Sequence, residues 1–196
     1  MVKIKIYRHG ETNWNVKKIM QSHTDIPLNL TGLVQAFELE KLLKDEKFDL
    51  FLSSDLSRAH QTCRVATQKH DANIPLILSS NLRELNFGNY EGMDLESFIT
   101  KFDNAKIMQD LNNPESFNIK IPGGESQKDV VNRFISCLDD AINTYPMARH
   151  IAIFTHAGVM RSLYRYLLNK DKMFDNCECL ELSYNLEYGK LEVLCN

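Results

Sequence analysis

The chain has 196 residues, of which 43% are hydrophobic and 25% are charged, and its formal net charge is −3. This composition is typical of a globular protein and excludes a largely disordered chain. The length allows a substantial hydrophobic core, and we expect a single domain over residues 1–196. The weak negative charge argues against a nucleic-acid partner, so a bound anion would be held by a few clustered arginines.

The sequence carries no sign of a membrane or secretory segment. No apolar run approaches the roughly 20 residues of a membrane span, and the alternating apolar and charged start of the chain does not resemble a signal peptide. The five cysteines include no pair with the two-residue spacing of a redox or zinc motif, which favours reduced thiols. We therefore expect a cytoplasmic protein with no membrane partner.

Short apolar runs predict the strands of a sheet. Four of them lie at residues 3–7, 48–53, 74–78 and 151–154. Pro75 in the third run indicates an edge strand, because proline cannot donate to a sheet ladder. Two alternating runs at 179–186 and 190–194, separated by Glu187-Tyr188-Gly189, predict a C-terminal antiparallel hairpin.

Amphipathic segments predict helices between these strands, at residues 31–44, 56–69, 158–168 and from residue 126 onward. The first is expected to bury Leu33, Phe37, Leu39, Leu42 and Leu43. The pattern Ser126-Gln127-Lys128-Asp129 is a capping box. It begins a long helix whose apolar side would comprise Val130, Val131, Phe134, Leu138 and Ile142.

The alternation of strands and helices predicts an α/β fold. We expect a three-layer α/β/α sandwich with a mainly parallel sheet, helices on both faces and the antiparallel hairpin at its end. Residues 86–125 are richer in Asn, Gly and Pro than the rest and interrupt this alternation. We interpret them as an excursion that forms a lid or rim.

Reactive side chains follow each apolar run. Arg8 and His9 come after the first run, Arg58 after the second, Glu84 after the third and His156 after the fourth. The carboxyl ends of parallel strands meet at one edge of a sheet, so these side chains should lie together. Guanidinium groups fit the oxygens of a phosphate dianion. The scarcity of acidic residues and the lack of a paired-histidine motif predict no metal and no cofactor.

Six segments around these residues occur in the order found in a known family. They are Tyr7–Asn15, Thr24–Gly32, Ser53–Thr62, Leu82–Gly92, Pro122–Ser126 and Thr155–Gly158. Together they closely resemble the motifs of the histidine phosphatase superfamily, in its phosphoglycerate mutase-like branch. The resemblance covers nearly the whole chain.

This resemblance implies a role for each matching residue. His9 matches the nucleophile that forms a phosphohistidine, Glu84 the proton donor to the leaving group, and Arg8, Arg58 and His156 the groups that hold the phosphate oxygens. The further substrate-binding positions are Asn15, Gln21, Ser22 and Ala157. The family commonly has Gln-Gly where this chain has Gln21-Ser22. That departure concerns the mouth of the pocket and hence the preference for a leaving group.

The chemistry of the residues agrees with these roles. A histidine nucleophile requires a neutral ring with one bare nitrogen, and flanking arginines would lower the pKa of His9. Glu11 is the rival candidate for the acid because it lies two residues from His9. His60 is interpreted as a residue of a helix surface.

Three functions remain open at this point. The first is a phosphomonoesterase acting on a small phosphate ester, of the small phosphatase type that resembles α-ribazole-phosphate phosphatases. The second is a phosphomutase of the phosphoglycerate type, and the third is a phosphate-binding module without catalysis. Residues 86–125 contain no arginine, and only Lys101, Lys106 and Lys120 are basic. The carboxylate of phosphoglycerate would therefore lack a bidentate partner there, which favours the phosphatase.

Overall fold

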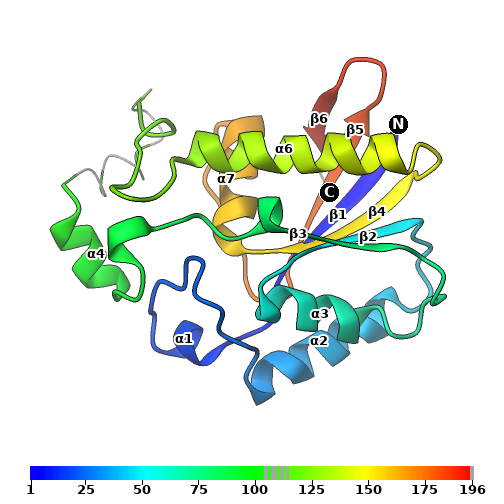
Figure 1. Cartoon of the computed structure of the whole chain (residues 1–196), viewed down its shortest axis with the longest axis horizontal. Helices are drawn as coiled ribbons and strands as arrows, with labels where there is room; N and C mark the ends of the chain where they lie inside the picture. The colour runs from blue at the N-terminus through cyan, green and yellow to red at the C-terminus, as the bar shows by residue number, and fades with distance from the viewer. Residues whose placement is uncertain (104–105, 107–109, 111–112, 114, 195–196) are drawn as a thin grey trace.

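The computed structural model describes residues 1–103, 106, 110, 113 and 115–194. Its centre is a six-stranded sheet with the order β3-β2-β4-β1-β5-β6 (Figure 1). The strands are β1 (Val2–Arg8), β2 (Leu50–Ser54), β3 (Leu76–Ser79), β4 (His150–Thr155), β5 (Cys179–Asn185) and β6 (Lys190–Val193). The first four strands pair in parallel, whereas β5 and β6 form an antiparallel pair beside β1.

Helices cover both faces of the sheet. One face carries α2 (Leu30–Leu43) and α3 (Ser57–Ala66), and the other carries α6 (Gln127–Thr144) and α7 (Ala157–Leu168) (Figure 1). Two shorter helices, α1 (Asn13–Val16) and α4 (Leu95–Lys101), lie outside these layers, as do the 3₁₀ turns η1 (Ser80–Leu82) and η2 (Gly88–Tyr90). Within the described ranges, no helix has the length and apolarity required to cross a membrane.

The sheet separates two hydrophobic clusters because alternate strand residues point to opposite faces. On β4, Ile151 and Ile153 join the cluster under α6 and α7, whereas Ala152 and Phe154 join the cluster under α2 and α3. The same alternation holds along β1 and β2. Both faces of β2 and β4 are therefore buried, and these two strands read as continuous apolar runs in the sequence. Strand β1 exposes Lys3 and reads instead as an alternation of apolar and charged residues.

The predicted fold class is confirmed. Each predicted strand and helix is present, with ends that differ by at most three residues. Strand β3 is an edge strand, as Pro75 indicates, and the C-terminal hairpin forms. The Ser126–Asp129 capping box is also present, and the five apolar residues predicted to face the core from that helix are buried.

The buried face predicted for α2 is wrong. Leu39 and Leu43 are buried, but Phe37 and Leu42 are 46% and 74% exposed. The face that packs consists instead of Gly32, Ala36, Leu39 and Leu43. The helix lies so close to the backbone of Gly10 and Glu11 that a Cβ at position 32 would overlap the backbone of Glu11. A prediction that follows the large apolar residues therefore assigns the wrong side of this helix to the core.

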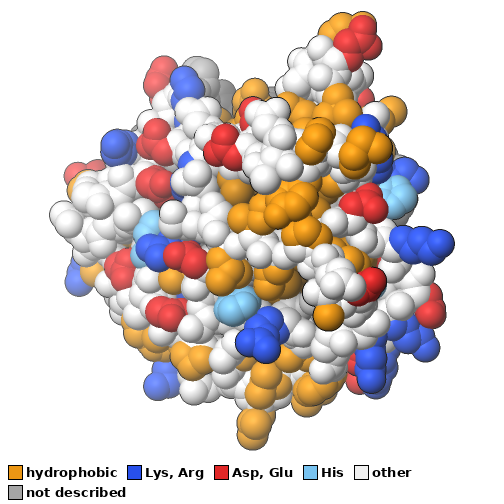
Figure 2. Space-filling view, turned by 45° about the vertical axis from the view of Figure 1, so that its right-hand side comes forward, with side chains coloured by type: hydrophobic (Ala, Val, Ile, Leu, Met, Phe, Trp, Pro, Cys, Tyr) orange, Lys and Arg blue, Asp and Glu red, His pale blue; other side chains and the backbone are white. Residues whose placement is uncertain are grey.

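The surface offers no broad field of one sign on the face seen in Figure 2. Lys and Arg side chains are interspersed with Asp and Glu, and hydrophobic side chains gather near the centre of the view. This distribution agrees with the small net charge of the chain.

We expect Gly32→Ala to lower the free energy of unfolding by about 1–3 kcal/mol, the usual cost of overpacking. An alanine would normally stabilise a helix by about 1 kcal/mol relative to glycine, so the sign is reversed here. The reason is that a Cβ at Gly32 would overlap the backbone of Glu11. Urea unfolding measures the change, with Val34→Ala on the exposed side of α2 as the control. Stabilisation by Gly32→Ala would contradict this packing.

Candidate active site

The predicted site residues converge at the carboxyl edge of the parallel strands. Arg8 ends β1 and lies opposite Thr155 at the end of β4, so that His9 and His156 follow side by side. Their rings are 5.2 Å apart, measured between centroids. Arg58 enters from the first turn of α3, directly after β2. Glu84 follows η1, which continues from β3.

The His9 ring is buried and fixed in one tautomer. Its Nδ1 lies 2.7 Å from the carbonyl oxygen of Gly10, which can only accept, so Nδ1 carries the proton. The other ring nitrogen, Nε2, is therefore the bare one. Burial lowers the pKa of His9 well below its ordinary value, and the charges of Arg58 and Arg8 lower this pKa further. A neutral, oriented imidazole is the form that a nucleophile requires.

Arg8 is held by the segment that precedes β5. Its Nη1 donates to the carbonyl oxygen of Phe174 over 2.7 Å, and its own carbonyl accepts from the N–H of Cys177. Asn176 in the same segment donates from Nδ2 to the carbonyl oxygen of His9. The Nε atom of Arg8 is buried and has no hydrogen-bond partner among the described residues. This donor suits an anion oxygen, because an unsatisfied buried N–H is costly.

Arg58 is fully buried and uses three of its five N–H groups within the protein. Its Nη1 and Nη2 donate to the carbonyl oxygens of Thr24 and Ser22, each over 2.9 Å, and its Nε donates to Nδ1 of His156 over 3.2 Å. Two N–H groups are left for a ligand. Burial lowers the pKa of Arg58 to about 10, which keeps the side chain cationic at neutral pH.

His156 is the second buried imidazole of the site. Because Nδ1 accepts from Arg58, the proton resides on Nε2, which donates to the hydroxyl of Ser54 over 2.9 Å. Burial lowers the pKa of His156 well below its ordinary value, and the charge of Arg58 acts in the same direction. His156 is also the residue before α7, whose first-turn N–H groups favour an anion nearby.

Hydrogen bonds hold both the side chain and the backbone of Glu84. Its carboxylate accepts from the backbone N–H groups of Leu85 over 2.8 Å and of Gly158 over 3.2 Å. Its carbonyl oxygen accepts from Arg133 and from His23. A Cβ at Gly158 would collide with the Glu84 carboxylate, and one at Gly10 would meet the backbone of α2.

The mouth of the site is a loop tied to the 84–91 segment. Ser22 is buried, has a φ of 49°, and accepts from the N–H of Phe87 through its hydroxyl. Glu91 accepts from Thr24 and from the N–H of His23. Gln21 is also buried, and its Oε1 has no hydrogen-bond partner in the described part of the chain. A serine here occupies a left-handed backbone position that favours glycine, at the cost of backbone strain.

Three other residues named from the sequence lie in different surroundings. Asn15 belongs to the capping box of α1, where its side chain accepts from the N–H and hydroxyl of Thr12. The Glu11 carboxylate accepts from Asn29 at the start of α2, away from the cavity that Glu84 lines. His60 is half-buried on α3.

Several residues that hold the site in place were not predicted from the sequence. Arg133 on α6 pairs with Glu125 and donates to the carbonyl oxygens of Asn81 and Glu84. Asn176 supports His9 from 167 positions away in the chain. Glu125 lies in the quoted Pro122–Ser126 motif, which was a usable signal for this network. Nothing local in the sequence distinguishes Arg133 or Asn176 from surface residues.

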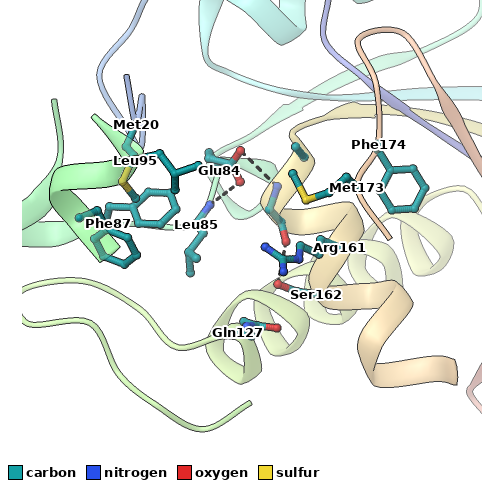
Figure 3. A pocket seen from close by; sticks show the side chains of 13 residues that line it. Met20, Glu84, Leu85, Phe87, Leu95, Gln127, Arg161, Ser162, Met173 and Phe174 are labelled. Atoms are coloured by element: carbon teal, nitrogen blue, oxygen red, sulfur yellow. Dashed lines mark hydrogen bonds between the residues drawn. The ribbon is translucent and has the colours of Figure 1, made fainter. Parts of the chain in front are cut away.

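A cavity of about 200 Å³ adjoins the cluster on the side of Glu84. Figure 3 shows Glu84 between Met20, Phe87 and Leu95 on one side and Met173 and Phe174 on the other. Ala157 also lines this cavity, together with the next residue, Gly158. The cavity therefore adjoins the cluster of arginine and histidine side chains that suits a phosphate group.

Within the described residues, no three His, Cys, Asp or Glu side chains are grouped so that they could hold a metal ion. The cysteines at 63, 137, 177 and 179 are free thiols. The cationic groups of the site are the two arginines.

Comparisons with known proteins agree with this arrangement. The profile of the histidine phosphatase superfamily (branch 1) matches residues 4–196. A broad-specificity phosphatase of Saccharomyces cerevisiae, YOR283W, is 32% identical over 172 residues, which cover 85% of this chain and 70% of that protein. The probable phosphoglycerate mutase GpmB of Escherichia coli is 32% identical over 139 residues, which cover 71% of this chain and 62% of that protein.

Solved structures share the fold. The mycobacterial glucosyl-3-phosphoglycerate phosphatase in complex with VO3 has a TM-score of 0.84 at 22% identity, with 99% of this chain and 97% of that chain covered. The fold and the cationic site at its carboxyl edge define an α/β enzyme of phosphate esters. The chain belongs to the histidine phosphatase superfamily and, as a member, is a hydrolase of phosphoric monoesters.

We expect the free energy of unfolding to fall as the pH drops below about 6.5, the ordinary pKa of histidine. The unfolded chain then takes up protons that His9 and His156 refuse in the folded state, because folding lowers the pKa of both. The stability that each neutral histidine contributes is fully present above that pKa, and below it this contribution is lost by up to about 1.4 kcal/mol per pH unit.

Urea titrations between pH 5.5 and 8 check this expectation, with His9→Asn as the variant. Below pH 6.5, the free energy of unfolding of the variant should fall less steeply than that of the unsubstituted protein, by up to about 1.4 kcal/mol per pH unit. Above pH 7.5, the two curves of unfolding free energy against pH should be parallel. Equal slopes in the acidic range would show that His9 titrates alike in the folded and unfolded chain.

Proposed function

We propose that this enzyme hydrolyses the phosphate monoester of a small metabolite through a phosphohistidine on His9. The observation that carries the proposal is the bare Nε2 of His9, which the bond from Nδ1 to Gly10 leaves as the only nucleophilic ring nitrogen. The guanidinium groups of Arg8 and Arg58 are both close enough to His9 to lower its pKa. They would offset the charge of the transferring phosphoryl group.

The steps follow from these positions. Nε2 of His9 attacks phosphorus, the bond to the ester oxygen breaks, and Glu84 donates a proton to the departing oxygen. Water then attacks the phosphohistidine, with the Glu84 carboxylate taking its proton, and inorganic phosphate leaves. Arg8 and Arg58 would hold the phosphoryl oxygens throughout, and His156 would join them by exchanging its bond to Ser54 for one to a phosphoryl oxygen. Asn15, Gln21, Ser22 and Ala157 are proposed contacts of the bound ester.

Several features support hydrolysis over transfer to a second metabolite. A mutase must bind the far end of its substrate and shield the phosphohistidine from water. Residues 86–125 contain no arginine for that purpose, and those of them that line the cavity, Phe87, Leu95 and Phe98, are apolar. We propose that these three residues form a rim of the substrate pocket; positions 104–105, 107–109, 111–112 and 114 of the predicted lid or rim lie outside the described residues. We also propose that the enzyme acts in the cytoplasm, on a small-molecule ester and without metal, nucleic acid or membrane.

The nucleophile is tested by trapping the covalent intermediate. Incubation with a phosphate donor, followed by mass spectrometry at neutral to alkaline pH, should place an acid-labile phosphoryl group on His9. His9→Ala should abolish the label, because no other bare imidazole nitrogen lies at this position. A label on a serine, aspartate or cysteine would overturn the mechanism.

The acid is tested by varying the leaving group. Glu84→Gln should lower the activity on an alkyl phosphate by about 10²- to 10⁴-fold, because an alkoxide must be protonated as it leaves. The loss should be smaller on p-nitrophenyl phosphate, whose phenolate leaves readily. Glu11→Gln is the matched control and should change the ratio of the two activities little. Equal losses on both esters in Glu84→Gln would remove Glu84 from this role.

The acceptor is tested by following both products. With 3-phosphoglycerate, in the presence and absence of 2,3-bisphosphoglycerate, inorganic phosphate should accumulate with little 2-phosphoglycerate. Rapid interconversion of the two phosphoglycerates with little release of phosphate would favour the mutase. No turnover of any phosphate monoester would favour the binding module.

A further inference from the structure

The cavity beside Glu84 is the place where the leaving group must lie. The carboxylate that would protonate the departing oxygen forms part of its wall, as do Ala157 and Gly158 at the start of α7. Its remaining wall is mostly apolar, with Met20, Leu95 and Met173 among the residues that border it (Figure 3). A cavity of about 150 Å³ accepts benzene, so about 200 Å³ accommodates a substituted aromatic ring.

The positive charge in this wall is already neutralised. Arg161, one turn into α7, is the only cationic side chain among the described residues that line the cavity. Its Nε and Nη2 donate to the two carboxylate oxygens of Asp171, each over 2.6 Å. The guanidinium lowers the pKa of Asp171, which keeps that carboxylate ionised at neutral pH. The hydroxyl of Ser162, the next residue along α7, donates to the carbonyl oxygen of Gly158.

This pairing sets a penalty for anionic leaving groups. A carboxylate in the cavity would meet a guanidinium whose charge Asp171 already compensates and whose bidentate edge Asp171 already occupies. It would also approach the carboxylate of Glu84. An apolar group meets no such penalty and gains about 25 cal/mol for each Å² of apolar surface that it buries.

We propose that the cavity beside Glu84 selects monoesters with an uncharged, apolar leaving group, and that Asp171 enforces this selection by occupying Arg161. This inference rests on the proposed phosphatase function and specifies its substrate class. Asp171 acts through Arg161 and is a positioning residue, so the informative readout is the ratio of two activities and not the activity itself.

The first measurement compares two esters of similar size on the unsubstituted enzyme. We expect kcat/KM for 4-methylphenyl phosphate to exceed that for 4-carboxyphenyl phosphate by about tenfold or more, which is the usual value of one hydrogen bond to a charged group. The difference should reside mainly in KM, because both leaving groups are phenolates.

The second measurement frees Arg161. Asp171→Asn should lower this ratio about tenfold, because the guanidinium becomes available to the carboxylate of the substrate. Glu46→Gln is the matched control. Glu46 pairs with Lys5 at similar exposure, 34% and 29% against 31% and 27% for Asp171 and Arg161, and does not line the cavity. It removes the same charge and should leave the ratio unchanged.

A third variant decides the question even if Asp171→Asn fails to fold. Leu95 borders the cavity from α4 and is 47% exposed, so a long side chain fits there without entering the core. Leu95→Arg supplies an unpaired cation and should lower the ratio, whereas Leu95→Gln should lower it far less.

The outcomes separate this inference from the proposed function. If the enzyme hydrolyses neither ester, the proposed function itself fails. If it hydrolyses both with equal kcat/KM, or if Leu95→Arg leaves the ratio unchanged, only the selection by charge is overturned. If Asp171→Asn folds and leaves the ratio unchanged, the role of Asp171 is overturned. An equal effect of Glu46→Gln would assign the change to net charge and would also overturn it.

Discussion

The guanidinium of Arg58 is the constraint on which the rest of the site depends. A fully buried cation is stable only when its donors are satisfied and acidic groups lie near it. Arg58 meets this requirement by binding two carbonyl oxygens of the mouth loop and one nitrogen of His156, with Glu84, Asp25 and Glu91 as the surrounding acids. One side chain thus fixes the loop, the tautomer of the second histidine and the positive field around the first.

The loop has its own anchors, which explain why Arg58 finds its acceptors in place. Asp25 accepts from the N–H and hydroxyl of Ser57 and so caps α3, whose preceding residue, Leu56, offers no capping side chain. Capping is worth about 1 kcal/mol to a helix. The same contact holds the loop against the helix that carries Arg58. The contact between Asp25 and Ser57 therefore both stabilises α3 and fixes the geometry of the site.

The sequence predicted those parts of the molecule in which local pattern and tertiary packing agree. The buried run Ile151–Phe154 and the capping box at Ser126 are examples, because each is determined by neighbours in the chain. The buried face predicted for α2 was wrong at Phe37 and Leu42 because the helix packs through Gly32, where the backbone of Glu11 leaves no room for a Cβ. Asn176 and Arg133 were missed because their partners lie 167 and 49 positions away, respectively. Where motifs matched a family, the resemblance supplied what periodicity could not.

The position of β1 determines when the nucleophile can become oriented during synthesis on the ribosome. This first strand lies between β4 and β5, and its pairs with His150 and Tyr184 join opposite ends of the chain. His9 and Arg8 are further held by residues 174–177. A nascent chain that already contains every reactive side chain up to His156 still lacks the partners that orient the nucleophile. Catalytic competence therefore requires residues 174–185 to be synthesised and arises only when β5 pairs with β1.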